Sequence, residues 1–220
     1  SDWGTRDYFA PMFKGHLLTQ MPEARIIDIT HQVEPHRSHD AIDIVHHACP
    51  AFPKGTIHII DTSSNAGSKY IAAELDGHYY LCADNGLLFT AFQRPCDRTV
   101  LLSHPDDKPS TFFADTLLLP AAIRLAQGTP LDQLGTPYTE NSISSLRLYN
   151  YKDDQLSAVI TRVDTYGNAH LGITRQEFES IQAGRSFTSS LDRHVKMHDI
   201  KTSYVPNPNT HNILLLESHT

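Results

Sequence analysis

Apolar positions set the first expected elements of the chain. They recur at helical spacing after the opening loop, at Phe9, Met12, Phe13, Leu17 and Leu18. Residues 24–33 (ARIIDITHQV) are dense in isoleucine and predict a buried strand, and residues 39–49 return to helical spacing. A Pro-Lys-Gly turn then leads into a second predicted strand within 52–61. The pattern therefore indicates helix, strand, helix and strand in that order.

The pattern continues into a hairpin, a strand and a longer helix. Three elements are expected in order: a hairpin at 69–88 that turns at Asp76-Gly77, a helix from about Leu87, and a strand at 98–102. Residues 114–128 predict a helix that Gly128 closes and Pro120 bends.

Strands that alternate with helices favour an α/β sheet with parallel pairs, in which ligands bind at the carboxyl ends of strands. Asp2, His31 and the 61–68 loop are expected at those ends. Threonine, serine, proline and asparagine dominate around 136–148, which predicts a linker. The expected domains are therefore an N-terminal α/β sheet domain with helices at 1–135 and a smaller β-rich domain at 149–220.

Composition narrows the possible partners. The 220 residues carry a net charge of −7 with neutral histidines and no basic run, which argues against a nucleic-acid partner. The longest apolar stretches are short or interrupted, so no membrane span is expected. Three cysteines without CxxC spacing argue against disulfides and favour the reducing cytoplasm. The fourteen histidines lack the spacing of a metal site, so no metal is predicted.

Several polar positions have an ordinary structural explanation. Asp2 and Asp7 lie on the loop before the first expected helix, where either could be an N-cap. Asn85 could cap the helix from Leu87 or contact a ligand. The DTYGN stretch at 164–168 could be a plain hairpin turn, because glycine and asparagine are common turn residues.

Five stretches, taken together and in order, resemble one family: SDWGTRDYF, ARIIDITHQVEP, FPKGTIHII, ADNGLL and VDTYGN. From Ser1 to about Thr174 the chain is similar to the S-adenosyl-L-methionine hydroxide adenosyltransferases, which include fluorinating and chlorinating enzymes. The resemblance implies an N-terminal α/β domain, a C-terminal β-barrel-like domain, and a homotrimer that binds its substrate between subunits. It also implies a strand before Ser1 and a hairpin after Thr220, so both domains are expected to be incomplete in the printed sequence.

The resemblance further implies a reaction and roles for individual residues. Water or a halide displaces methionine from the ribose C5′ of S-adenosyl-L-methionine, which is the substrate, and no cofactor is needed. Asp2 matches the aspartate that holds the ribose hydroxyls, and a carboxylate can accept both of those hydrogen bonds. The groups that match the methionine end are Asp7, Asp164 and Asn168. The other substrate-binding residues implied are Trp3, His36 beside the adenine (or a plain surface residue), Asn85, Phe112 and Tyr166.

The chain departs from the family where the nucleophile is handled. The family's aspartate, arginine and histidine for water fall on Ser63, Tyr70 (beside Lys69) and Phe113. Asp61 and Lys69 would replace the charged groups only if the loop is shifted by one or two residues.

The chain also lacks the hydroxyl groups with which the halide-using members of the family bind the halide. Their hydroxyl donors fall on Ala66 and Ala114, whose side chains cannot donate a hydrogen bond. Phe112 and Phe113 would make the pocket dry, although Phe113 could equally be part of the core. The expected catalytic set is therefore Asp2, Ser63, Phe113 and Ala114.

The leading hypothesis is an enzyme that hydrolyses S-adenosyl-L-methionine to adenosine and L-methionine. Two alternatives stay open: a chloride-dependent halogenase, and a protein that binds an adenosyl compound without turnover. The replaced positions favour the last of these, because the charged groups that handle water are missing.

Overall fold

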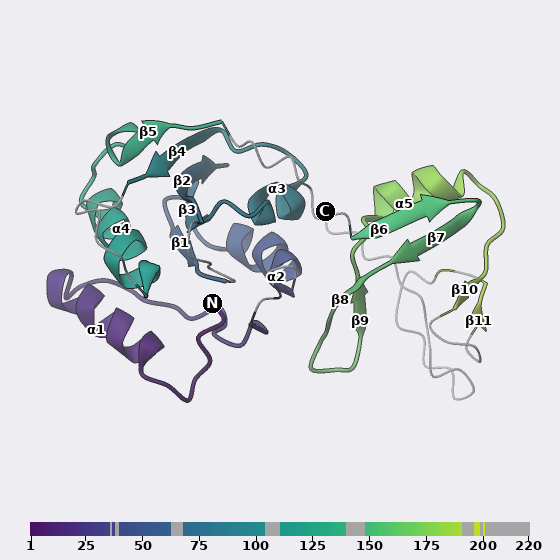
Figure 1. Cartoon of the computed structure of the whole chain (residues 1–220), viewed down its shortest axis with the longest axis horizontal. Coiled ribbons are helices and arrows are strands. Elements are labelled where there is room, and N and C mark those ends of the chain that lie inside the picture. Colours follow the sequence, from purple (N-terminus) through teal and green to yellow (C-terminus); the bar gives the residue numbers. More distant parts are fainter. Residues whose placement is uncertain are drawn as a thin grey trace. The chain divides into compact units, whose positions relative to one another are not determined.

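A five-stranded sheet forms the centre of the N-terminal unit, residues 1–147, and a second unit comprises residues 148–220 (Figure 1). The computed structural model describes residues 1–35, 37, 40–62, 68–103, 111–139, 148–190, 196–198 and 200. In spatial order the strands are β1 (Ile57–Ile60), β3 (His78–Ala83), β2 (Tyr70–Leu75), β4 (Arg98–Leu102) and β5 (Gly135–Pro137). β1 and β3 are parallel, whereas the other neighbouring pairs are antiparallel, so the sheet is mixed.

Helices cover both faces of this sheet. They are α1 (Phe9–Gln20), α2 (Asp40–Ala48), α3 (Leu87–Phe92) and α4 (Leu119–Ala126), with a π-helical turn at Ala114–Leu118 and short 3-10 turns at Cys49–Ala51 and Leu131–Gln133. Figure 1 shows α1 and α4 on one side of the sheet, and α2 and α3 on the other. Successive residues of β2 and β3 are therefore almost all buried, as expected for strands covered on both faces.

The expected elements from 39 to 128 are largely confirmed. The hairpin turns at Asp76-Gly77, where both residues have positive φ, as a tight two-residue turn requires. The helix expected at 114–128 begins as a π-helical turn and becomes α4 around Pro120, which lies in the first turn of α4, where proline is tolerated. Of the parallel pairs expected in the sheet, the described strands form one, between β1 and β3.

The prediction of a buried strand at 24–33 is wrong for the described chain. This segment has no strand pairing, and Ile26, Ile27 and Ile29 are 36–65% exposed. A run of isoleucines forms a strand only when a neighbouring strand satisfies its backbone groups, and no described strand pairs with this segment. Its end is nevertheless ordered, because Val33 is buried and its N–H donates to Ser1 O.

Gly135 in β5 is expected to tolerate no side chain. A Cβ at this position would lie 1.9 Å from the carbonyl oxygen of Leu101 on β4. Gly135→Ala should therefore lower the free energy of unfolding by about 2 kcal/mol, the scale of an overpacked site. The matched control is Gly15→Ala on α1, where no atom lies within 4 Å and helix propensity predicts a gain of about 0.5–1 kcal/mol. Urea denaturation compares the two variants, and equal stabilities would contradict the expectation.

The described residues of the second unit form three antiparallel ladders and one helix. The ladders are β6 (Tyr149–Lys152) with β7 (Gln155–Ala158), β8 (Ile160–Val163) with β9 (Ala169–Leu171), and β10 (Ser189–Ser190) with β11 (Lys196–Met197). Helix α5 (Arg175–Gln182) begins with a capping box between Thr174 and Glu177. The barrel-like closure implied by the resemblance stays a prediction.

In the parts of the chain that the structure describes, no helix combines the length and the apolar character needed to cross a membrane.

Candidate active site

Two carboxylates follow directly from parallel strands of the N-terminal unit. Asp61 comes after the last residue of β1, and Asp84 comes after the last residue of β3. Ile60 lies opposite Cys82 in the parallel register, so the carboxyl ends of both strands lie at the same edge of the sheet. This edge is where α/β sheets bind ligands. Asp61 is buried, at 6% exposure, so its carboxylate needs hydrogen-bond donors from the protein to offset the loss of water.

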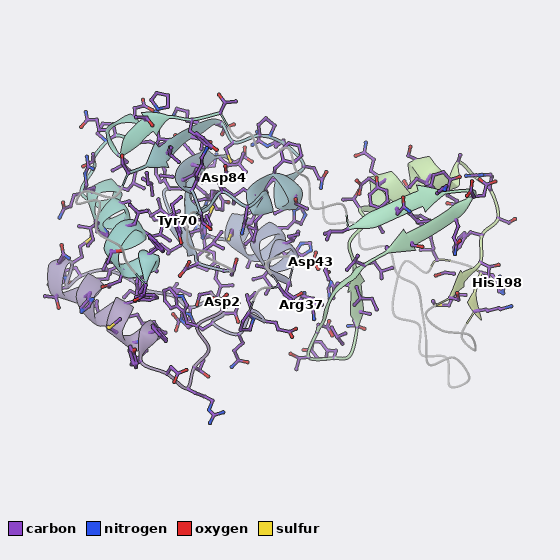
Figure 2. All side chains as sticks on the ribbon, in the orientation of Figure 1. Asp2, Arg37, Asp43, Tyr70, Asp84 and His198 are labelled. Carbon is purple, nitrogen blue, oxygen red and sulfur yellow. The ribbon has the colours of Figure 1, made fainter. Side chains whose placement is uncertain are left out.

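The opening loop docks at this edge. The Asp2 N–H donates to Asp61 O at 3.3 Å, and the Gly4 N–H donates to His31 O at 2.6 Å. These bonds place the predicted ribose-binding Asp2 beside the backbone of Asp61, in the loop before α1 (Figure 2). The structure thus brings Asp2, His31 and Asp61 together, although His31 does not follow a strand as the sequence predicted.

Trp3 connects the opening loop to Asp61 and to an aromatic cluster. Its indole Nε1–H donates to Asp61 Oδ2 at 2.9 Å. The ring stacks on His31 and packs against Phe13 and Phe112, with ring centroids 5.0–5.6 Å apart. The sequence suggested a substrate contact for Trp3, which stays a prediction, and it did not reveal this hydrogen bond.

The residues expected to line a dry pocket at the nucleophile lie against the hydrophobic core. Ala114 is completely buried at the start of the π-helical turn, and Phe113 stacks on Tyr70 with ring centroids 5.1 Å apart. Phe112 packs edge-on against Trp3. These contacts agree with the core alternative for Phe113, and a direct role for Phe112, Phe113 or Ala114 at the nucleophile stays a prediction.

Asp84 and Asn85 have local partners. The Tyr138 hydroxyl donates to Asp84 Oδ2 at 2.7 Å, and Lys69 Nζ lies over the Tyr138 ring, 5.2 Å from its centroid. Asn85 Oδ1 accepts the Leu87 N–H at 3.2 Å, so its side chain supports the first turn of α3. The N-cap of α3 is Gly86 and the helix has no side-chain cap, so Asn85 is not the cap that the sequence offered as an alternative, and a contact with a ligand stays a prediction.

Asp7 is exposed on the loop that leads into α1. The helix begins after Tyr8 and has no side-chain cap, so the N-cap explanation is wrong for both Asp2 and Asp7. A role of Asp7 at the methionine end stays a prediction. His36 and Ser63 lie outside the described residues.

The DTYGN stretch of the second unit is a self-contained turn between β8 and β9. Asp164 Oδ1 accepts the N–H groups of Tyr166 and Asn168, and Oδ2 accepts the Asn168 side-chain amide at 2.8 Å. The Asn168 amide and backbone lower the pKa of Asp164 to about 2. Tyr166 is 92% exposed. The plain turn that the sequence offered as an alternative is therefore present, and binding of methionine by this turn stays a prediction.

Asp61 was considered in the sequence only as a replacement that needs the loop to shift by one or two residues. Alignment on glycines placed the family's aspartate at Ser63, two positions further along. Asp61 directly follows an apolar strand, and this position was the available signal, since strand ends carry ligand-binding groups. Within the described ranges, no cluster of three or more histidine, cysteine or acidic residues is arranged to hold a metal.

A mixed α/β domain with carboxylates at the ends of parallel strands is typical of a domain that binds a small molecule. Residues 1–135 match the family model described as the SAM hydroxide adenosyltransferase N-terminal domain, and the chain belongs to this family. The resemblance drawn from the five stretches is thereby confirmed.

Curated relatives of two kinds are similar to most of the chain. The (R)-S-adenosyl-L-methionine hydrolase of Salinispora arenicola is 28% identical over 82% of this chain and 73% of the relative. The protein of the same name from Thermus thermophilus is 27% identical over 77% of this chain and 71% of the relative. A fluorinase of Actinopolyspora mzabensis is 24% identical over 84% and 73% of the two chains.

The fold is also found in a solved structure. The crystal structure of an uncharacterized conserved protein from Thermotoga maritima superposes with a TM-score of 0.76 at 23% identity. The match covers 97% of this chain and 85% of the other. It shows that the two proteins share a fold.

Proposed function

We propose that this protein hydrolyses S-adenosyl-L-methionine to adenosine and L-methionine. The observation that carries the proposal is the match of residues 1–135 to the SAM hydroxide adenosyltransferase family. Curated relatives named (R)-S-adenosyl-L-methionine hydrolase support it, because they are similar over most of the chain. The docking of Asp2 at the end of β1, beside Asp61, agrees with a small-molecule site there.

The proposed reaction is a single displacement. The water oxygen bonds to C5′ while the C5′–sulfur bond breaks, and the bonding pair goes to sulfur to give the neutral thioether of methionine. Because the sulfonium is a good leaving group, the protein chiefly has to orient water and accept its proton. We assign the proton to the buried carboxylate of Asp61, whose position after β1 replaces the expected Ser63 in this role.

The remaining roles follow the resemblance. Asp2 would hold the ribose hydroxyls, and Asp7, Asp164 and Asn168 would hold the methionine end. A homotrimer would supply the second unit of a neighbouring subunit to each site. The hydrogen bonds of Asp164 lower its pKa, so its carboxylate stays ionised even at pH values well below neutral. An ionised carboxylate suits the ammonium group of methionine.

One specific observation favours a second candidate, chloride-dependent halogenation. Curated relatives named fluorinase match the chain at 24% identity. The deciding experiment is incubation with S-adenosyl-L-methionine in buffers with and without chloride, followed by chromatography of the nucleosides. We expect adenosine in both buffers. A 5′-chloro nucleoside that forms only with chloride would replace the hydrolase by the halogenase. Binding by calorimetry without any product would replace both by a binding protein.

A further inference from the structure

The buried carboxylate of Asp61 accepts a hydrogen bond from the Trp3 indole. The indole Nε1–H of Trp3 can only donate, and it lies 2.9 Å from Asp61 Oδ2. A buried carboxylate is stabilised by such bonds, and their direction fixes the orientation of its oxygens. The indole bond occupies one of the roughly four acceptor positions of a carboxylate.

Trp3 is itself held rigidly. Its ring is parallel to the His31 ring within 12°, with the centroids 5.6 Å apart. Phe13 from α1 and Phe112 pack against it at 5.3 and 5.0 Å. An indole packed against three rings in this way has few rotamers available, so its N–H keeps one direction.

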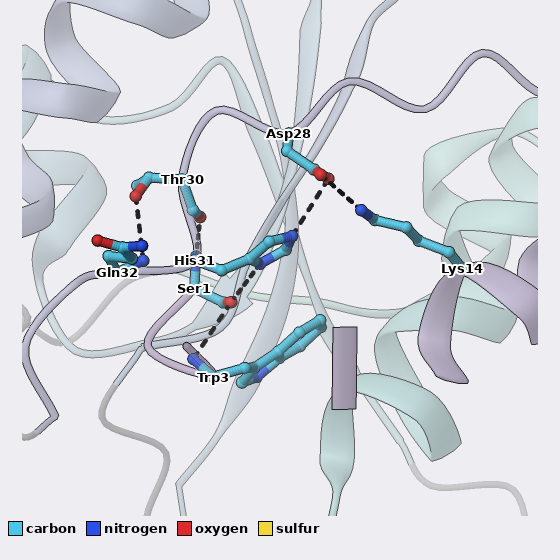
Figure 3. Close-up of polar contacts among 7 residues, drawn as sticks. All are labelled: Ser1, Trp3, Lys14, Asp28, Thr30, His31 and Gln32. Carbon is cyan, nitrogen blue, oxygen red and sulfur yellow. Dashed lines mark hydrogen bonds and ion pairs between the residues drawn. The ribbon is translucent and has the colours of Figure 1, made fainter. Parts of the chain in front are cut away.

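A chain of polar contacts holds the His31 ring in turn (Figure 3). Lys14 from α1 donates to Asp28, and this hydrogen bond keeps the pKa of Asp28 below its usual value. His31 Nε2 lies 3.1 Å from Asp28, and Nδ1 lies 2.8 Å from Ser1 Oγ. The neutral tautomer with its proton on Nε2 suits both contacts, because the Asp28 carboxylate can only accept and the Ser1 hydroxyl can donate to Nδ1. Burial lowers the pKa of His31, which favours this neutral form.

The same chain returns to the opening loop. The Trp3 backbone N–H donates to Ser1 Oγ at 3.4 Å, so Ser1 links the His31 ring to the backbone of Trp3. Both the ring and the backbone of Trp3 are therefore fixed from the 28–31 segment. The arrangement runs from Lys14 on α1 through Asp28, His31 and Trp3 to Asp61.

We propose that Trp3 is a positioning residue that orients the Asp61 carboxylate toward the attacking water, and that His31, fixed by Asp28, holds Trp3 in place. The proposal rests on the proposed hydrolase function, because it deepens the role given there to Asp61. It differs from the substrate contact that the sequence suggested for Trp3, since the effect of Trp3 passes through Asp61.

The first test is Trp3→Phe, which removes the N–H donor and keeps an aromatic ring in the cluster. We expect kcat to fall about tenfold, the scale of one lost orienting hydrogen bond, with KM within about twofold of wild type. Phe92→Leu is the matched control. It removes an aromatic ring that packs against Tyr80 on the opposite face of the sheet. It should lower the melting temperature and leave kcat unchanged.

Two outcomes of the first test would overturn the proposal. An unchanged kcat would show that the indole N–H does not act on the reaction. A raised KM with unchanged kcat would show that Trp3 binds substrate directly. A wild-type protein that forms no adenosine would instead remove the proposed function, and with it the catalytic role of Trp3.

The second test needs no activity and no stable Trp3→Phe variant. Trp3 is the single tryptophan, so a ¹⁵N-labelled sample gives one indole N–H resonance. Asp61→Asn weakens the acceptor and should shift this resonance upfield, and His31→Ala should broaden or shift it by loosening the ring. His16→Ala, an exposed histidine whose partner is Asp115, is the control and should leave it in place. An indole resonance that is the same in wild type and Asp61→Asn would overturn the proposal.

Discussion

Replacing Asp2 with alanine is expected to remove most of the protein's preference for nucleosides that carry a ribose diol. The proposed role of Asp2 is to accept hydrogen bonds from both hydroxyls. Hydrogen bonds to a charged acceptor contribute about 1.5 kcal/mol each at the low end, so two of them correspond to roughly a hundredfold in affinity. Wild type should therefore bind adenosine about a hundredfold more tightly than 2′,3′-dideoxyadenosine.

The Asp2→Ala protein should bind the two nucleosides almost equally, which calorimetry can measure. Its fold should be retained, because the contact of Asp2 with Asp61 runs through the backbone N–H and does not need the side chain. Glu23→Ala is the matched control, since it removes one exposed carboxylate from the loop after α1 and should keep the preference for the diol. If Asp2→Ala kept that preference in full, the assignment of Asp2 to the ribose would be wrong.

Elements with strong local signals could be predicted from the sequence. Asp76-Gly77 defined the β2–β3 hairpin because both residues adopt the positive φ that the turn requires. The helix expected at 39–49 from the spacing of its apolar residues is α2, Asp40–Ala48. The strand expected at 24–33 failed because its formation depends on a pairing partner, which a local pattern of isoleucines cannot report.

Only those parts of the candidate site that a local sequence motif marks could be predicted from the sequence. Asp2 was expected at a strand end and lies beside the end of β1, and its role at the ribose stays a prediction. The choice between Ser63 and Asp61 stayed open because a gapped alignment across the 61–68 loop cannot fix a register to within two residues. The link from Trp3 to Asp61 joins residues 58 positions apart, so no local pattern could show it.

A buried histidine pair on the other face of the sheet should make the N-terminal unit sensitive to acid. His58 on β1 and His78 on β3 are each 5% exposed, and His58 Nε2 lies 3.2 Å from His78 Nδ1. The rings also pack against Tyr80. Burial, and then the neighbouring His78, lower the pKa of His58 from 6.5 to about 4. His58 is therefore neutral in the folded protein at neutral pH.

The direction of the pH effect follows from proton binding. The unfolded chain takes up a proton on His58 near pH 6.5, whereas the folded chain does so only near pH 4. Between these values the unfolded state binds more protons, so lowering the pH favours unfolding. The contribution of neutral His58 to the free energy of unfolding is complete above pH 6.5 and is lost as the pH falls to about 4. For this pKa shift the free energy of unfolding changes by about 3 kcal/mol. Asp28 and Asp164 have lowered pKa values, so they act in a separate window below pH 3.8.

Urea denaturation at a series of pH values between 7 and 4 measures this loss. Replacing both histidines, as His58→Phe with His78→Leu, removes the titrating pair and leaves no unpaired ring nitrogen, so the double variant should lose about 3 kcal/mol less over the same range. The control is His16→Ala, whose side chain is 52% exposed, and it should keep the slope of the wild type. A double variant as acid-sensitive as the wild type would show that the buried pair is not the cause. A flattened curve would identify the β1–β3 pair, the parallel strands that carry Asp61 and Asp84, as the part of the sheet that acid destabilises first.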